Sequence, residues 1–116
     1  MVMNMGFTLE GGLQGNTLAL TCTGVVRDYD AYKAFKAVLF ELAGTNEIDH
    51  LKKKAFEVLE VKFVDAYPLP DSLVGFFLKL SERDSISVNL TTNENKMLSF
   101  FISIFLDEKF NVRLFL

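Results

Sequence analysis

Three neighbouring polar residues form the best candidate for a binding or catalytic site in this sequence. Asp65 and Asp71 bracket a short loop that contains both prolines of the chain, and Ser72 follows directly. In open α/β sheets, sites gather beyond the carboxyl ends of strands, which is where this loop begins. The N–H groups at the start of the helix expected after Pro70 also favour an anion. These residues therefore either contact a partner or simply cap that helix.

The other reactive side chains form neither a metal site nor a nucleophilic set. His50 is the only histidine and Cys22 the only cysteine, so matched metal ligands are missing. Cys22 alternates with Leu18 and Leu20 on the apolar face of a predicted strand, where a thiol is a core residue rather than a nucleophile. The glycines in 11–15 join strand to strand, whereas a phosphate loop opens a helix. We expect no metal, no cofactor and no enzymatic activity.

The apolar periodicity predicts the elements that position the candidate site. Strands are expected over 7–10, 17–23, 56–64, 85–90 and 111–116, and helices over 31–42, 73–80 and 97–106. Strands that alternate with helices indicate parallel pairing with crossover connections. The sequence therefore predicts a single α/β domain over 1–116. It would hold one mixed, mainly parallel sheet, opened by an N-terminal hairpin and covered by helices mainly on one face.

Turn and cap residues set the expected boundaries of these elements. The run 11–16 is dense in glycine and predicts the turn of the hairpin. Asp28 and Asp30 are candidate N-caps for the first helix. Thr91 and Glu94 fit a capping box at the start of the last helix.

Composition narrows the class of protein. The 116 residues are 50% hydrophobic, include 12 phenylalanines and carry a net charge of −3, so nucleic acid is a poor candidate partner. The most apolar stretch, 97–106, is too short to span a bilayer, and residues 1–6 lack the features of a signal peptide. With a single cysteine, no internal disulfide can form. We expect a cytoplasmic protein that does not enter a membrane.

The order of elements and several short segments resemble the STAS domain, the family of sulfate transporters and anti-sigma factor antagonists. The matching segments are Thr21–Val25, Val58–Val61, Pro70–Ser72, Ile86–Leu90 and Thr91–Glu94. They resemble the family's second strand, its third strand, the start of its Asp-Ser-Ser/Thr-Gly-Leu motif, its fourth strand and the start of its third helix. The resemblance runs from Phe7 to nearly the end of the chain.

The one specific motif of that family is half kept. Asp71 and Ser72 match its Asp and first Ser, but Leu73 stands where the second Ser/Thr, usually the phosphorylated one, would lie. Val74 replaces the following glycine, and the preceding loop is about three residues longer. The resemblance thus implies the fold more strongly than the phospho-switch, and Ser72 is a displaced acceptor.

Three functions remain open from the sequence. The resemblance implies a protein-binding module in bacterial signalling. It would present the loop Asp65–Ser72 and the second helix to a partner such as an anti-sigma or kinase-like protein. Phe100, Phe101 and Phe105 exceed what one helix face needs, which predicts a homodimer interface or a deeply buried helix. A small-molecule pocket beside the Pro-rich loop is the third alternative, in which Asp65 and Asp71 alone would do any acid–base work.

Overall fold

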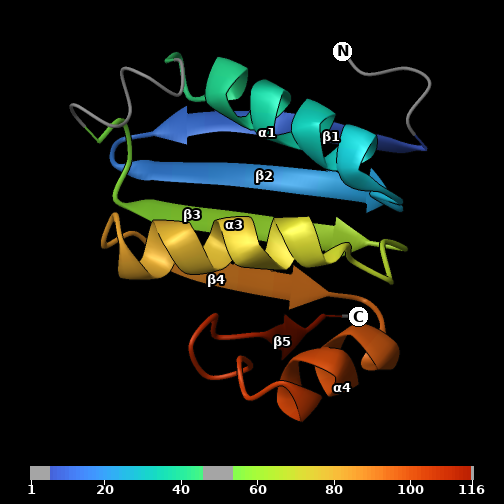
Figure 1. Cartoon of the computed structure of the whole chain (residues 1–116). Coiled ribbons are helices and arrows are strands. Elements are labelled where there is room, and N and C mark those ends of the chain that lie inside the picture. Colours follow the sequence, from blue (N-terminus) through green and yellow to red (C-terminus); the bar gives the residue numbers. More distant parts are fainter. Residues whose placement is uncertain (1–5, 46–53, 116) are drawn as a thin grey trace.

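The structure, a computed structural model, describes residues 6–45 and 54–115 and confirms the predicted α/β class. Five strands form one sheet, and the described residues add three helices (Figure 1). The elements in chain order are β1 (Phe7–Gln14), β2 (Thr17–Gly24), α1 (Tyr29–Leu42), β3 (Val58–Val64), α3 (Asp71–Glu82), β4 (Ser87–Thr92), α4 (Asn95–Ser103) and β5 (Arg113–Leu114).

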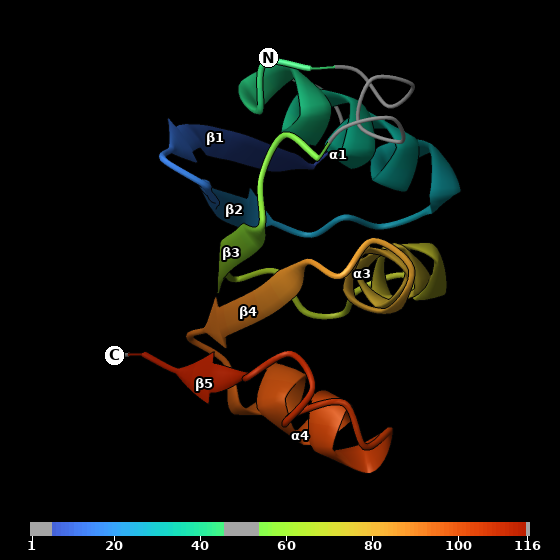
Figure 2. The ribbon, with the colours of Figure 1, turned by 90° about the vertical axis from the view of Figure 1, so that its left-hand side faces the viewer.

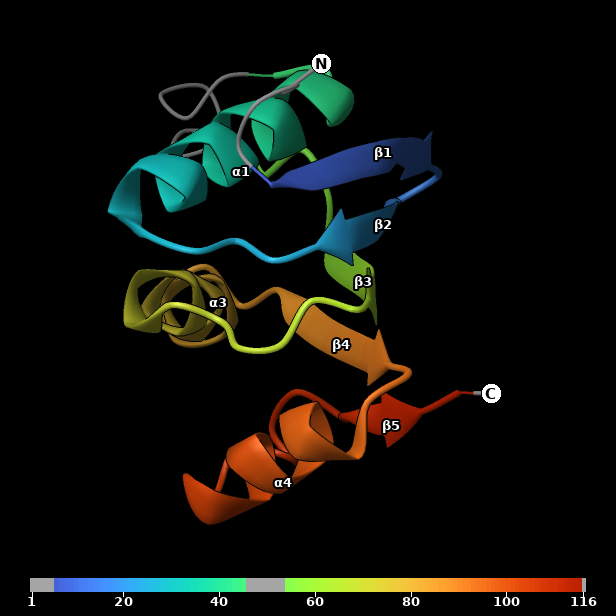
Figure 3. The same ribbon diagram turned by 90° about the vertical axis from the view of Figure 1, so that its right-hand side faces the viewer.

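The strands lie in the sheet in the order in which they occur along the chain, β1-β2-β3-β4-β5. β1 and β2 pair antiparallel as a hairpin, and every later pair is parallel. Figures 2 and 3, taken from opposite sides, show that α1, α3 and α4 all lie on the same face of the sheet. The expected mixed sheet, opened by a hairpin and covered on one face, is confirmed.

The hairpin turn is shorter than the glycine run predicted. β1 continues through Gly11 and Gly12 to Gln14, and only Gly15 and Asn16 connect the strands. Gly11 is needed for close approach, because a Cβ there would lie 2.1 Å from the Ala19 carbonyl oxygen. Most of the glycine-dense run therefore belongs to the strand pair, and the predicted turn over 11–16 is wrong except at Gly15 and Asn16.

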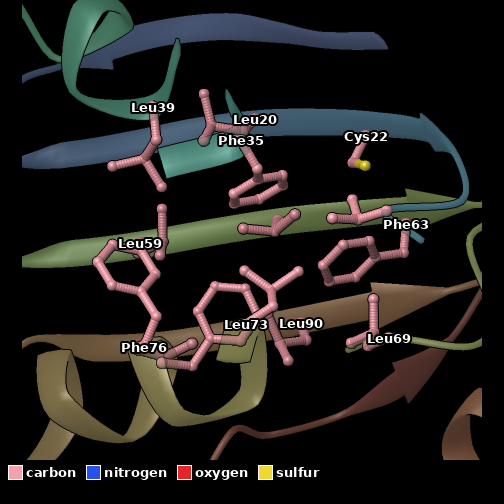
Figure 4. Packing of buried hydrophobic residues seen from close by; sticks show 14 of the residues in the cluster. Leu20, Cys22, Phe35, Leu39, Leu59, Phe63, Leu69, Leu73, Phe76 and Leu90 are labelled. Carbon is pink, nitrogen blue, oxygen red and sulfur yellow. The ribbon is translucent and has the colours of Figure 1, made fainter. Parts of the chain in front are cut away.

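The core lies between the sheet and its helices, and it accounts for most of the phenylalanines. Leu18, Leu20 and Cys22 alternate along β2 and are at most 3% exposed, while Thr23 is exposed. Figure 4 shows Leu20 and Cys22 among the packed side chains of the core. Each such fully buried side chain contributes roughly 1.5–3 kcal/mol. The largest side chains that are less than 2% exposed are aromatic: Phe35, Phe56, Phe63, Phe77, Phe101 and Phe110.

The helix starts follow the sequence in one case and depart from it in two. Asp28 caps α1, since its carboxylate accepts a hydrogen bond from the Ala31 N–H at 2.9 Å. The cap residue of α3 is Pro70, whose carbonyl accepts from the Leu73 N–H, so the expected capping by Asp71 or Ser72 is wrong. Neither the Asp71 nor the Ser72 side chain therefore caps α3.

The capping box predicted for the last helix is also wrong. Thr91 lies inside β4, and Glu94 is the cap residue of α4 without a side-chain cap bond. Its carboxylate instead accepts from the Tyr67 N–H at 3.0 Å, so a tertiary contact replaces the local one. The last strand is confined to Arg113–Leu114, and the last helix ends at Ser103.

Candidate functional site

Asp65 lies at the carboxyl edge of the sheet, where it ties two loops together. Its N–H donates to Asn93 Oδ1 at 3.0 Å, and Asn93 Nδ2 donates back to Asp65 Oδ1 at 2.9 Å. Asp65 has a φ of 53°, a left-handed conformation that Asp adopts more readily than most residues. The loop after β3 is thereby fixed to the loop after β4, which identifies Asp65 as a bridging residue.

Asp71 and Ser72 lie apart from this bridge, on the first turn of α3. Asp71 is the first helical residue and is exposed, where its negative charge is favourable beside the helix N-terminus. Ser72 is half-buried and faces the neighbouring helix α1 across a groove. The structure therefore separates the three predicted site residues, placing Asp65 in a loop bridge and Ser72 in a hollow.

This hollow, the α1–α3 groove, has a volume of about 340 Å³. Tyr29, Tyr32 and Lys36 of α1 line it, together with Ser72, Gly75 and Lys79 of α3. Of these residues, sequence analysis singled out only Ser72. The sequence contains a pattern that could have identified the residues of α1. Tyr29 and Tyr32 are each followed four residues later by a lysine, which places ring and amine on one helix face.

The groove has an aromatic floor. Tyr32 is 8% exposed and Phe76 of α3 is 7% exposed, and their rings meet edge-on with centroids 6.1 Å apart. Tyr29 stacks near Tyr32, at 5.7 Å between centroids, yet remains 61% exposed. One tyrosine thus belongs to the core and the other offers its ring to solvent.

Lysine side chains border this floor. Lys36 Nζ lies 5.5 Å from the centroid of Tyr32, and Lys33 Nζ lies 5.3 Å from that of Tyr29. Such cation–π contacts hold an ammonium over a ring face. Lys33 is also 3.6 Å from the Asp30 carboxylate, so its charge is partly balanced. Among the described residues, Lys36 and Lys79 are the charged members of the groove lining.

Cys22 is a core residue, as the strand pattern predicts. It is 0% exposed, and burial raises the pKa of its thiol to about 12. At neutral pH such a group is protonated and shielded, which is unsuited to nucleophilic attack. His50 lies outside the described residues. Within 6–45 and 54–115, no three His, Cys, Asp or Glu side chains group so that they could hold a metal ion.

The three phenylalanines proposed for an interface have different environments. Phe101 is 0% exposed and packs on Phe110, at 5.9 Å between centroids, so its assignment to a surface is wrong. Phe100 is half-buried against Tyr67 and Phe101. Phe105 is 88% exposed.

Phe105 belongs to an exposed apolar surface that follows the last turn of α4. With Ile102 and Ile104, which are 49% and 38% exposed, it forms what we call the apolar end of α4. Its φ of 61° is left-handed, a conformation that a bulky side chain rarely adopts. An exposed aromatic residue in an unfavourable backbone conformation gives the folded monomer no evident advantage.

No described helix is both long and apolar enough to cross a bilayer. Comparison of the chain with protein-family models, curated proteins and solved structures found no match. The resemblance to STAS domains therefore rests on the element order and short segments of this sequence, with which the observed mixed sheet is consistent.

Proposed function

We propose that this chain is a STAS-like protein-binding module of the anti-sigma-antagonist type, acting in the cytoplasm in bacterial signalling. The observation that carries the proposal is the position of Ser72. It occupies the first serine of the half-kept family motif, and it lies half-buried in the α1–α3 groove beside lysines and tyrosines. Tyrosine is enriched in protein-recognition surfaces because it offers both apolar area and a polar tip.

A binding role agrees better with the side chains than a catalytic one. The Asp65 carboxylate is engaged by Asn93, and the Cys22 thiol is buried and protonated. Asp71 is exposed at the surface of α3. Acid–base catalysis requires a group positioned against the reacting proton in a sheltered site. Surface recognition requires only that the groove and the start of α3 are accessible, as they are.

Affinity capture from the cells that make the protein tests this function. Three versions of the full chain serve as bait: the wild type, Ser72→Glu, and Ser99→Glu as a control at an exposed position on α4. We expect a specific protein partner with the wild type and the control, and at least tenfold less with Ser72→Glu, because the new charge occupies the groove. Absence of any specific partner, or equal recovery with all three baits, would contradict the proposal.

A second candidate function, self-association, is favoured by the apolar end of α4. Phe105 exposes 88% of its surface next to two exposed isoleucines, which is typical of contact surfaces. Light scattering of the full chain over a range of concentrations measures the mass. A concentration-dependent dimer that Phe105→Ser abolishes would support this function, and a monomer at the highest concentration would exclude it.

A further inference from the structure

The face of the sheet opposite the helices carries exposed charges on its central strand. The three described helices, α1, α3 and α4, all lie on the other face (Figures 2 and 3). Along β3, Leu59, Val61 and Phe63 are at most 1% exposed, whereas the alternating residues Glu60 and Lys62 are exposed. Successive side chains of a strand point to opposite faces. Glu60 and Lys62 therefore lie together on the side away from the helices, which we call the open face.

The neighbouring strands surround these two charges with small or uncharged side chains. Residues paired across adjacent strands share a face of the sheet. Those paired in register with Glu60 and Lys62 are Ala19 and Thr21 of β2 and Asn89 and Thr91 of β4. All six residues line a depression of about 340 Å³ on the open face. That volume is at the lower end of ligand sites and suits the side chains of a facing surface rather than a whole helix.

The open face carries charges of both signs. Lys62 Nζ lies 4.3 Å from the centroid of the Phe115 ring, and this cation–π contact holds the ammonium over the sheet. Glu60 lies two residues earlier on the same strand, which separates the two Cα atoms by about 7 Å. The edge strands add Glu10 on β1 and Arg113 on β5. Such a surface is complementary to a second copy of itself rather than to a strongly acidic or basic partner.

We propose that the open face binds the open face of a second copy of this chain in a two-fold symmetric dimer. Each copy then contributes the same surface, so every contact occurs twice. A two-fold axis that lies between the sheets and crosses the strands at the level of Val61 places Glu60 of each copy opposite Lys62 of the other. Packed sheets lie about 10 Å apart, a separation that these two long side chains bridge. This contact is separate from the α1–α3 groove and from the apolar end of α4, and it goes beyond the proposed function.

The size of the open face predicts a weak dimer. Four strands of about seven residues cover about 19 Å by 23 Å, or roughly 450 Å² on each copy. A total of about 900 Å² is in the range of transient complexes rather than obligate dimers. Because the central contacts are ion pairs of exposed residues, salt should weaken them. We therefore expect association that depends on both protein and salt concentration.

Sedimentation velocity over a range of protein concentrations tests the dimer. Every sample carries Phe105→Ser, so that the apolar end of α4 does not contribute to the mass. The Phe105→Ser chain should dimerise as its concentration rises, and NaCl at about 0.5 M should weaken the dimer at least threefold. A chain that stays monomeric at the highest concentration, or a dimer that salt does not weaken, would overturn the inference.

Charge reversal tests the pairing of Glu60 with Lys62. Glu60→Lys leaves two cations at the centre of the open face, and Lys62→Glu leaves two carboxylates. Each variant alone should dimerise at least tenfold more weakly than the parent chain. An equimolar mixture of the two should recover the dimer to within threefold of the parent, because opposite charges face each other again. Single variants that dimerise like the parent, or a mixture that stays monomeric, would contradict the pairing.

Matched charge changes elsewhere separate the open face from the effect of net charge. Glu41→Lys and Lys96→Glu make the same changes at exposed residues of α1 and α4, and each should alter dimerisation less than twofold. Effects as large as those of the open-face variants would overturn the assignment. Circular dichroism melting curves should be nearly the same for all variants, since every substituted residue is exposed, and recovery in the mixture independently shows that both single variants are folded.

Discussion

Two exposed aromatic residues, Tyr29 at the start of α1 and Phe105 just after α4, lie in different settings. Tyr29 is 61% exposed and lines the α1–α3 groove, and Lys33 Nζ lies 5.3 Å from the centroid of its ring. Phe105 is 88% exposed and has the isoleucines of the apolar end of α4 beside it. Charged groups around an aromatic surface favour reversible, charge-steered association, whereas an apolar surface favours packing that excludes water.

Exposure of an aromatic ring does not by itself define a binding site. The groove combines an aromatic floor with polar side chains from two helices, α1 and α3. The apolar end of α4 specifies only that water is unfavourable there. In the proposed function, the groove would recognise a partner and the apolar end would serve self-association.

Both regions rest on one core, and the reactivity of Cys22 reports whether that core is intact. Burial raises the pKa of this thiol from 9.0 to about 12, so native labelling by iodoacetamide should be slower than labelling of the urea-unfolded chain by about a thousandfold or more. Mass spectrometry over time measures both rates, and similar rates would contradict the buried position.

The same pKa shift has a consequence for stability. Because the folded state holds the thiol proton more tightly, the contribution of Cys22 to the free energy of unfolding is fully present below about pH 9. It declines as the pH rises toward 12. Urea unfolding of the wild type and Cys22→Ala at pH 8 and pH 10 measures the difference. A contribution that grows with pH would have the wrong sign.

Truncation of a core phenylalanine should destabilise the fold on which both the α1–α3 groove and the apolar end of α4 depend. Phe77 is 0% exposed and its ring contacts those of Phe35, Phe63, Phe76 and Phe110. Phe77→Ala should lower the free energy of unfolding by about 3–5 kcal/mol, measured by urea titration. An effect below about 1 kcal/mol would contradict the central position of Phe77 in the core.

The loop bridge should matter for stability but not for recognition. Asp65→Ala removes the bond in which Asn93 Nδ2 donates to Asp65 Oδ1 and keeps the one donated by the backbone N–H of residue 65, and it should cost about 0.5–1.5 kcal/mol. Asn93→Ala removes both bonds and should cost more, and the double variant should cost less than the sum, since both single variants remove the same side-chain bond. Binding of the partner captured from cells should stay within twofold of the wild type. Loss of that binding at unchanged stability would instead place Asp65 in the recognition site.

The smallest expected effect is at Phe105, and it should be a gain in stability. Glycine adopts a φ of 61° without the cost that a bulky side chain incurs. Little buried contact is lost, so Phe105→Gly should raise the free energy of unfolding by about 0.5–1 kcal/mol. Thermal and urea unfolding at low protein concentration measure this effect. Destabilisation by more than about 1 kcal/mol would show that Phe105 supports the monomer.

The sequence predicted the architecture well because alternation and helical periodicity report which face of each element is buried. Leu18, Leu20 and Cys22 alternate and are buried as expected. Failures arose where tertiary contacts override local patterns. Gly11 serves a close strand approach rather than a turn, and Glu94 accepts from Tyr67 rather than capping its own helix.

The groove itself was only partly predictable. Ser72 could be singled out because it follows a proline loop at a helix start, but its neighbours Tyr29 and Lys36 lie more than thirty residues earlier. No local pattern indicates that α1 and α3 pack with their tyrosine and serine faces together. Periodicity also could not separate Phe101 from Phe105, because the helix ends at Ser103 and Phe105 leaves its register.

Amide chemical-shift mapping of the ¹⁵N-labelled full chain, titrated with the protein partner recovered from cells, shows which surface the partner contacts. We predict that the shifted amides cluster on the α1–α3 groove, at Tyr29, Lys36, Ser72, Gly75 and Lys79. Amides at the apolar end of α4 should remain unchanged. Shifts that cluster instead at Ile102, Ile104 and Phe105 would contradict the claim and assign recognition to the other end of the molecule.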